Sequence, residues 1–206
     1  MNTIDGREDW SISRAVKSIP TTYAGVNFRS RLEATWAAFF DACGWPWQYE
    51  PVDLDGWIPD FTIGWQPTLV EVKPFYDARD FDDVLTKVTQ AGYRGQVVLL
   101  GVSPWTDHQT FAITIGWLAT WIGDTTTNWN VEDLNIGWTE GNGKLGLCPM
   151  EGAWVNLIWP APENISHPNK WARVLEFKSS GTGMSALGTV LRHWTTAGNH
   201  ARWRPR

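Results

Sequence analysis

No apolar run in the chain approaches the roughly 20 residues that a membrane-spanning helix needs, so we expect no membrane partner. Residues 1–10 carry acidic side chains and no apolar stretch, which predicts that there is no signal peptide. The cysteines, Cys43 and Cys148, are too few and too far apart for a disulfide framework, and with the histidines they show no zinc-site spacing. Walker-type phosphate loops and dinucleotide fingerprints are also lacking. A reducing cytoplasm is the expected location.

Acidic residues are missing from the C-terminal end of the chain, although the whole sequence has a net charge of −5. After Glu176 every charged residue is basic: Lys178, Arg192, Arg202, Arg204 and Arg206. A basic tail on an acidic body is a candidate surface for contact with nucleic-acid phosphates. A tail that is merely solvated is the alternative.

Tryptophan is unusually frequent, with 16 residues in the chain. A buried indole contributes a large apolar area and needs one polar partner, so we expect the core to hold most of them. A few exposed indoles could instead stack on unpaired bases.

The hydrophobic pattern predicts an α/β fold with a mixed central sheet. Residues 27–43 are expected to form a helix, because apolar side chains recur there at helical spacing: Phe28, Leu32, Trp36, Phe39 and Phe40. Three strands, a second helix and a fourth strand are expected to follow, at residues 45–50, 57–64, 68–73, 77–90 and 96–102. The continuous apolar run in the last of these is typical of a strand buried on both faces.

Three regions are expected along the chain. Residues 1–26 form an N-terminal arm or short helix, and residues 27–104 form the α/β core. Residues 105–206 form a Trp-rich extension, mainly of strands and turns, which packs on the core and ends in a helix near residues 186–197 and the basic tail. We expect the extension to take part in substrate selection.

The residues with the clearest chemical meaning lie on the second and third expected strands. Alternate residues of a strand share a face, so Glu71 and Lys73 point one way and the neighbouring valines point into the core. Asp60 on the adjacent strand could converge with Glu71 on one metal ion, and the Val72 carbonyl could join them as a neutral ligand. Lys73 could then orient a water molecule or contact a phosphate. Together with Glu33 on the preceding helix, these groups suit metal-dependent phosphodiester cleavage.

Each of these residues also has a plain structural interpretation. Glu33 could complete a capping box with Ser30 at the start of the helix. Asp60 could be a turn residue that bonds to its own backbone. Glu71 and Lys73 could line the solvent face of a half-buried strand. It is the combination of all four, in this order, that favours the catalytic interpretation.

Residues 28–74 resemble the PD-(D/E)xK nuclease superfamily. The matching elements are Glu33 in the first core helix, Pro59-Asp60 in the second core strand and Glu71-Val72-Lys73 in the third. The flanking segments, residues 28–34 and 48–51, are similar to those of small nuclease-like proteins of phages and actinobacteria. A similar order of glutamate, Pro-Asp-Phe and Glu-Val-Lys-Pro occurs in the endonuclease subunit of Tn7-type transposition. The resemblance covers about residues 27–102 and implies a restriction-endonuclease-like core.

This resemblance also implies roles for individual residues. Asp60 and Glu71 would be metal ligands, Lys73 the catalytic lysine and Glu33 an outer or second-metal ligand, with Mg²⁺ as cofactor and Mn²⁺ as a substitute. Lys87 and Gln90 are candidates for an auxiliary role on the helix after the lysine, where a solvated helix face is the alternative. The candidate DNA contacts are Arg29, Arg31, Arg192, Arg202, Arg204 and Arg206.

The predicted function is therefore that of a Mg²⁺-dependent deoxyribonuclease, an endonuclease of phage or mobile-element type, in the cytoplasm of a bacterium or a phage-infected host cell. DNA is the expected partner, and the sequence does not distinguish it from RNA. A homodimer would suit duplex cutting, since one site cuts one strand. The alternative is a non-catalytic nucleic-acid-binding or protein-interaction module on the same fold.

Overall fold

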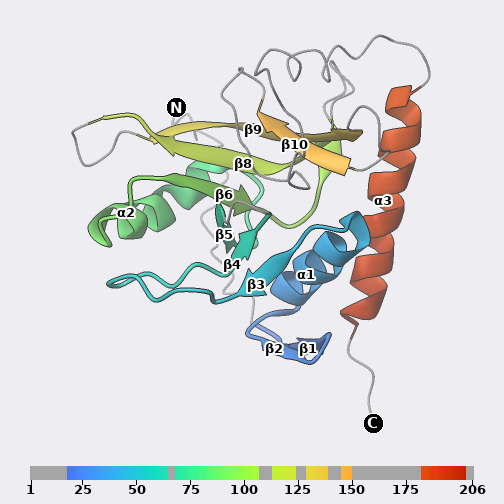
Figure 1. Ribbon diagram of the computed structural model, residues 1–206, viewed down its shortest axis with the longest axis horizontal. Coiled ribbons are helices and arrows are strands. Elements are labelled where there is room, and N and C mark those ends of the chain that lie inside the picture. Colours follow the sequence, from blue (N-terminus) through green and yellow to red (C-terminus); the bar gives the residue numbers. More distant parts are fainter. Residues whose placement is uncertain are drawn as a thin grey trace, which may run out of the picture.

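The computed structural model describes residues 18–64, 68–106, 113–123, 129–138, 145–149 and 182–202. In this part of the chain a mixed sheet lies between helices on its two faces (Figure 1). The helical elements are α1 (Arg31–Cys43), the 3₁₀ turn η1 (Ala78–Phe81), α2 (Asp82–Gln90) and α3 (Thr182–His200). The expected α/β class and mixed sheet are confirmed.

The strands that follow α1 build one eight-stranded sheet in the order β10-β9-β8-β6-β5-β4-β3, with β7 paired to β8. Their bounds are β3 (Trp47–Tyr49), β4 (Phe61–Ile63), β5 (Thr68–Val72), β6 (Gln96–Leu100), β7 (Trp105–Thr106), β8 (Ile113–Trp121), β9 (Trp129–Trp138) and β10 (Leu145–Pro149). β5 and β6 run parallel, whereas the other described pairs are antiparallel. A parallel pair needs a crossover, which η1 and α2 supply.

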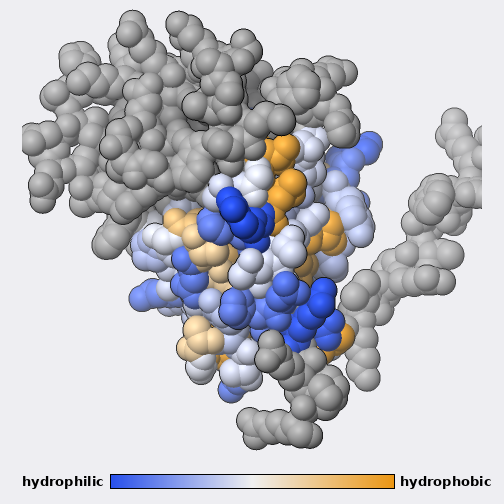
Figure 2. Space-filling view, turned by 90° about the vertical axis from the view of Figure 1, so that its right-hand side faces the viewer, coloured by the Kyte–Doolittle hydropathy of each residue, from blue (hydrophilic) through white to orange (hydrophobic). Residues whose placement is uncertain are grey.

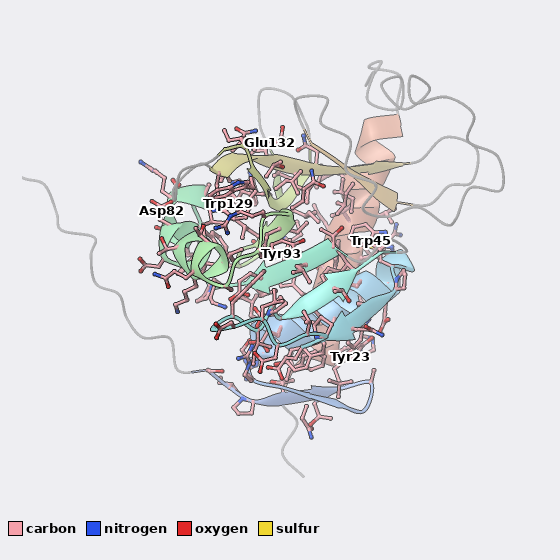
Figure 3. The ribbon with its side chains drawn as sticks, turned by 60° about the vertical axis from the view of Figure 1, so that its left-hand side comes forward. Tyr23, Trp45, Asp82, Tyr93, Trp129 and Glu132 are labelled. Carbon is pink, nitrogen blue, oxygen red and sulfur yellow. The ribbon has the colours of Figure 1, made fainter. Side chains whose placement is uncertain are left out.

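The two faces of the sheet are covered by different helices. α1 and α3 pack together on one face, and α2 covers the other (Figures 1 and 3). The alternation along β6 makes this plain, because Val98 and Leu100 join the cluster beneath α1 while Val97 and Leu99 join the cluster beneath α2. All four are fully buried, as expected for a strand covered on both sides.

The helix α1 begins later than its apolar stripe predicts. Asn27 and Phe28 belong to β2 (Val26–Phe28), which forms a hairpin with β1 (Thr21–Tyr23). Ser30 is the N-cap, in extended geometry, and its hydroxyl accepts a hydrogen bond from the Glu33 amide. Gly44 ends the helix as expected, in the left-handed conformation at φ 71°. The helix start at residue 27 was therefore wrong, because Ser30 provides the stronger capping signal.

The N-terminal arm also differs from the expectation. Its described part, residues 18–26, contains β1 and the start of β2 where a short helix was one prediction. Ala24 and Gly25, both at positive φ, make the turn of the hairpin. Residues 1–17 lie outside the described residues.

The described strands of the predicted extension continue the core sheet. β8 pairs with β6 along residues 117–120, and β9 and β10 add to its far side. α3 packs on α1 through Trp194, whose ring lies 4.5 Å from that of Trp36 between centroids. The described residues of this region therefore pack on α1 and β6, and the helix is longer than predicted.

Each tryptophan whose side chain the structure describes is buried or half-buried. Trp36, Trp45, Trp57 and Trp117 lie in the two core clusters, which confirms the expectation for these residues. Seen from the side of α3, the surface of the described residues mixes hydrophilic and hydrophobic side chains, as Figure 2 shows. In the described part of the chain no helix has both the length and the apolar character needed to cross a membrane.

Candidate functional site

Asp60 lies directly before β4 and is almost completely buried, with 1% of its surface exposed. Its Oδ2 accepts a hydrogen bond of 2.7 Å from the backbone amide of Val72 on β5. Its Oδ1 accepts one of 2.6 Å from the guanidinium of Arg29. The interpretation of Asp60 as a turn residue is therefore wrong, because its carboxylate bonds across to other elements.

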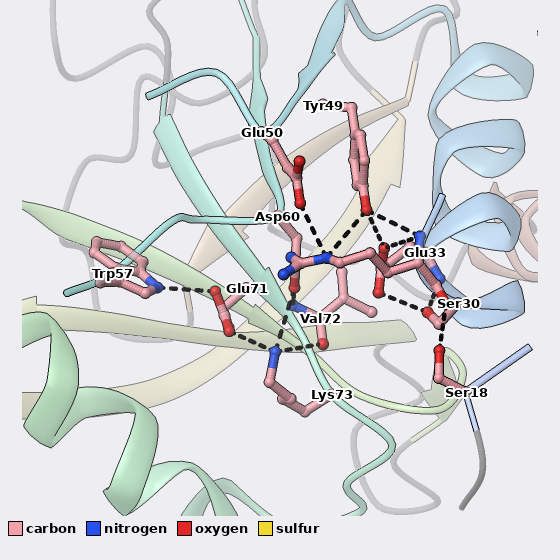
Figure 4. Close-up of polar contacts among 11 residues, drawn as sticks. Ser18, Ser30, Glu33, Tyr49, Glu50, Trp57, Asp60, Glu71, Val72 and Lys73 are labelled. Atoms are coloured by element: carbon pink, nitrogen blue, oxygen red, sulfur yellow. Dashed lines mark hydrogen bonds and ion pairs between the residues drawn. The ribbon is translucent and has the colours of Figure 1, made fainter. Parts of the chain in front are cut away.

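Glu71 and Lys73 extend from the end of β5 toward the α2 side of the sheet, while Val72 points to the α1 side, as the strand alternation predicts. Glu71 is only 6% exposed. Its two oxygens have different partners: Oε2 accepts from the indole of Trp57 at 2.9 Å, and Oε1 accepts from Lys73 at 2.5 Å (Figure 4). A solvated strand face is therefore ruled out for Glu71, since a buried carboxylate must be paired.

The ammonium of Lys73 occupies the point on which the predicted metal ligands converge. Its Nζ lies 2.5 Å from Glu71 Oε1, 3.1 Å from the Val72 carbonyl oxygen and 3.5 Å from Asp60 Oδ2. These are three of the four groups that the sequence predicted as ligands, and Glu33, the fourth, does not contact the ammonium. The fold thus brings two carboxylates and one carbonyl around a single positive charge.

The electrostatics of this cluster follow from burial. Burial raises the pKa of Asp60 to about 6, and the nearby charge of Glu71 adds to the shift, while Lys73 and the Val72 amide oppose it. For Lys73, burial alone would lower the pKa, but the charges of Asp60 and Glu71 outweigh it and the pKa is raised. The lysine therefore stays protonated and balances the two carboxylates.

Glu33, in the first turn of α1, is linked to the cluster through a second set of hydrogen bonds. Its Oε1 accepts from the Ser30 hydroxyl at 2.7 Å, and its Oε2 accepts from the Tyr49 hydroxyl at 2.6 Å and the Arg29 amide at 3.2 Å. Burial and the bond to Glu33 raise the pKa of Tyr49 to about 12, so its hydroxyl remains a donor. One half of the predicted capping box is present, since the Ser30 hydroxyl accepts from the Glu33 amide, whereas the Glu33 carboxylate accepts from the Arg29 amide and the Ser30 hydroxyl.

Arg29 connects the hydrogen bonds around Glu33 with those around Asp60. Its guanidinium bonds to Asp60 Oδ1 and, at 2.9 Å, to Glu50 Oε1, while 56% of its side chain remains exposed. The residue predicted as a DNA contact is therefore placed at the site, with its charge turned toward carboxylates. Arg31 is exposed on the first turn of α1.

The oxygen atoms of this cluster are of the kind that a magnesium ion binds. Mg²⁺ prefers oxygen ligands and commonly keeps several waters, so one or two carboxylates and a carbonyl are a suitable set. Asp60, Glu71 and the Val72 carbonyl provide that set around the Lys73 ammonium. Among the described residues no group of three or more His, Cys, Asp or Glu side chains has the geometry of a metal site, so Glu33 does not complete a triad.

The other predicted site residues lie away from this cluster or outside the described residues. Lys87 and Gln90 are on the exposed face of α2, opposite its buried residues, as the solvated-face alternative expected. Arg192 and Arg202 are exposed on α3 and just after it. The C-terminal end of α3 lies near the last turns of α1, because His200 packs near Tyr23 and Tyr23 bonds to Asp41 there. Glu33 lies at the opposite end of α1, in its first turn. Arg204 and Arg206 are outside the described residues.

Trp57 and Tyr49 are the site residues that the sequence pattern did not identify. Each donates to one of the predicted acidic residues, Trp57 to Glu71 and Tyr49 to Glu33. Tyr49 and Glu50 stand in the segment that resembles the nucleases, which was the only signal for them. Trp57 reaches Glu71 because the turn from Leu54 to Trp57 folds the chain back before Asp60. The hydrophobic periodicity of the sequence does not predict where this turn places the indole.

Comparison of the chain with protein-family models, with curated proteins and with solved structures gave no match. The resemblance to the PD-(D/E)xK nucleases therefore rests on the sequence motif alone.

Proposed function

We propose that the protein is a metal-dependent nuclease that hydrolyses phosphodiester bonds of DNA, an endonuclease of phage or mobile-element type on a restriction-endonuclease-like core. The observation that carries the proposal is the convergence of Asp60, Glu71 and the Val72 carbonyl on one cation, the Lys73 ammonium. The order of α1, β3, β4, β5, α2 and β6 also supports it, since it is the order that the resemblance implies.

A divalent ion bound at these oxygens would supply an activated water and would neutralise negative charge that develops on the phosphate. Two like charges cannot share the three oxygens, so the ammonium of Lys73 must move off them for such an ion to bind. Lys73 can do so because its side chain is one-third exposed and flexible. From a position beside Asp60 and Glu71, its charge can contact the phosphate of a bound substrate.

Asp60 is held in place by its surroundings. The Val72 amide fixes Oδ2, and Arg29 fixes Oδ1 from the exposed side of the site. Because Arg29 is more than half exposed, its guanidinium is the positive group nearest to solvent among the contacts of Asp60. We infer that Arg29 also attracts the phosphate backbone toward the carboxylates, which would otherwise repel it.

The test is cleavage of linear duplex, single-stranded, supercoiled and branched DNA and of one RNA, each with Mg²⁺, Mn²⁺ or EDTA. We expect wild-type activity that requires the metal and is lost, by at least about 10²-fold, in Asp60→Asn. Asp83→Asn, which changes an exposed carboxylate of α2, is the matched control and should cleave like wild type. Equal traces of cleavage in all three proteins would indicate contamination and refute the proposal.

A second candidate function is favoured by a different feature of the same site. Every carboxylate oxygen of Asp60 and Glu71 has a donor within the protein, so the network is complete without a metal ion. That arrangement suits a non-catalytic nucleic-acid-binding or protein-interaction module on the same fold. This alternative predicts no Mn²⁺ binding at Asp60 and Glu71 by calorimetry, and DNA binding, where present, without cleavage.

A further inference from the structure

Trp57 holds one oxygen of Glu71 from a fixed position. Its indole Nε1 donates to Glu71 Oε2 at 2.9 Å, and both side chains are buried. The backbone of Trp57 is fixed by two hydrogen bonds with Leu54, of 2.9 and 2.7 Å. Between them Gly56 takes φ 83°, a left-handed conformation that favours glycine. The tight turn therefore fixes the backbone position from which the Trp57 indole extends.

The far end of the indole is fixed by packing. Trp57 belongs to the cluster beneath α2, and its ring lies 5.8 Å from that of Tyr93 between centroids. Figure 4 shows the indole pointing at one oxygen of Glu71 while Lys73 lies at the other. With Oε2 occupied by Trp57, Oε1 is the oxygen that faces the cation.

We propose that Trp57 is a positioning residue of the cation site, which presents Glu71 Oε1 to a divalent cation by holding Oε2. An indole N–H can only donate, so it can hold a carboxylate oxygen but cannot compete for the cation. Groups that orient a metal ligand in this way commonly change metal affinity by about 10- to 100-fold when they are removed. The proposal rests on the proposed function in that it takes these oxygens as a metal site.

Two substitutions of Trp57 separate the donor from the bulk of the ring. Trp57→Phe keeps an aromatic ring and removes the N–H, whereas Trp57→His keeps a ring N–H at the same place and removes the larger ring. Trp129→Phe is the matched control, because Trp129 packs against the same cluster and donates at 2.9 Å to the Thr89 hydroxyl, away from the carboxylates.

The measurement is Mn²⁺ binding by calorimetry, made without DNA so that it does not depend on activity. We expect about tenfold weaker binding in Trp57→Phe, binding within a few-fold of wild type in Trp57→His and no change in Trp129→Phe. In protein labelled with fluorotryptophan, we expect the ¹⁹F resonance that Trp57→Phe removes to shift when Mg²⁺ is added. The resonance that Trp129→Phe removes should stay in place.

The outcomes separate this proposal from the proposed function. Equal Mn²⁺ affinity in wild type and Trp57→Phe, or a loss in Trp57→His as large as that in Trp57→Phe, overturns the positioning role alone. Binding that depends on the Trp57 donor, in a protein that cleaves no nucleic acid, upholds it and overturns the nuclease. Absence of both Mn²⁺ binding and cleavage overturns both. If Trp57→Phe does not fold, Trp57→His assigns the Trp57 ¹⁹F resonance, and a resonance that does not shift in wild type when Mg²⁺ is added overturns the positioning role.

Discussion

Lys73 holds together three oxygens that would otherwise repel one another or lack a partner. Its ammonium contacts Asp60, Glu71 and the Val72 carbonyl, and the negative charges of both carboxylates raise its pKa against the effect of burial. In the absence of a metal ion this makes Lys73 an internal counter-ion. In the proposed enzyme Lys73 is also a catalytic residue. It cannot be the counter-ion of the three oxygens and contact the substrate at the same time.

This double role gives a prediction for Lys73→Gln. We expect cleavage to be lost, while Mn²⁺ binds about tenfold more tightly, because the charge that competes for the three oxygens is gone. Calorimetry gives the dissociation constant, and the cleavage assay gives the activity. Lys87→Gln, an exposed change on α2, should alter neither. Weaker Mn²⁺ binding in Lys73→Gln would show that the lysine organises the oxygens and does not compete for them.

Among the secondary-structure elements, β8 is the one that joins the core to the described part of the extension. Its register shifts between Thr114 and Gly116, where a bulge interrupts the pairing with β9. A Cβ at Gly116 would collide with the carbonyl oxygen of Leu99 on β6. The close approach of β6 and β8 therefore depends on glycine at this position.

We expect Gly116→Ala to lower the free energy of unfolding by about 1–3 kcal/mol, because β6 or β8 must shift to admit the methyl group. Gly188→Ala is the matched control in α3, where a Cβ would meet nothing within 4 Å. It should stabilise the protein by about 1 kcal/mol, the helix propensity difference between the two residues. Urea unfolding measures both changes, and equal effects of the two substitutions would contradict the packing seen around Gly116.

The hairpin of β1 and β2 is tied to α1 and β3 through Asp41. The hydroxyl of Tyr23 and the indole of Trp47 each donate to this carboxylate at 2.9 Å. Burial, and then the hydrogen bond and charge of Asp41, raise the pKa of Tyr23 to about 12. Since this exceeds the ordinary value of about 10, the neutral phenol stabilises the fold below pH 10, and that contribution is lost as the pH rises through 12.

Tyr23→Phe is therefore expected to lower stability by about 1 kcal/mol at pH 7, the typical worth of one hydrogen bond. The difference between wild type and variant should shrink between pH 10 and 12, as followed by denaturant unfolding at each pH. Tyr76→Phe, at a side chain that is 82% exposed, should leave the stability unchanged. A difference that is constant up to pH 12 would mean that Tyr23 does not carry the shifted pKa.

For the molecule as a whole, metal binding and folding are coupled if the carboxylates form a metal site. The ligands come from the start of β4 and the end of β5, which meet only in the folded chain. An ion that binds the native state alone stabilises it by about 2.7 kcal/mol at 100 times its dissociation constant. For a protein of this size that corresponds to a rise in Tm of roughly 5–10 °C.

We expect Mn²⁺ to raise the Tm of the wild type in scanning calorimetry and EDTA to reverse the effect. Asp60→Asn should show no rise, because it lacks one of the two carboxylates. Asp83→Asn should respond like wild type. A rise of the same size in Asp60→Asn would place the ion elsewhere on the molecule.

The sequence by itself determined the elements whose signals are local. Periodicity identified α1, α2 and the strands from β3 to β6, and the continuous apolar run identified β6 as buried on both faces. The spacing of Glu71 and Lys73 was enough to place them on one face of β5, because side chains alternate along any strand. The start of α1 and the hairpin before it were missed, because capping by Ser30 outweighs the apolar stripe.

Tertiary structure alone decided which further groups bond to the predicted carboxylates. The Leu54–Trp57 turn brings an indole to Glu71, and the antiparallel pairing of β4 and β5 brings Asp60 to the Val72 amide. Arg29, read in the sequence as a DNA contact, is drawn to Asp60 and Glu50. Charge and spacing along a chain do not predict these hydrogen-bond and ion-pair partners. A carboxylate that is buried by folding bonds to whichever donors the fold places beside it.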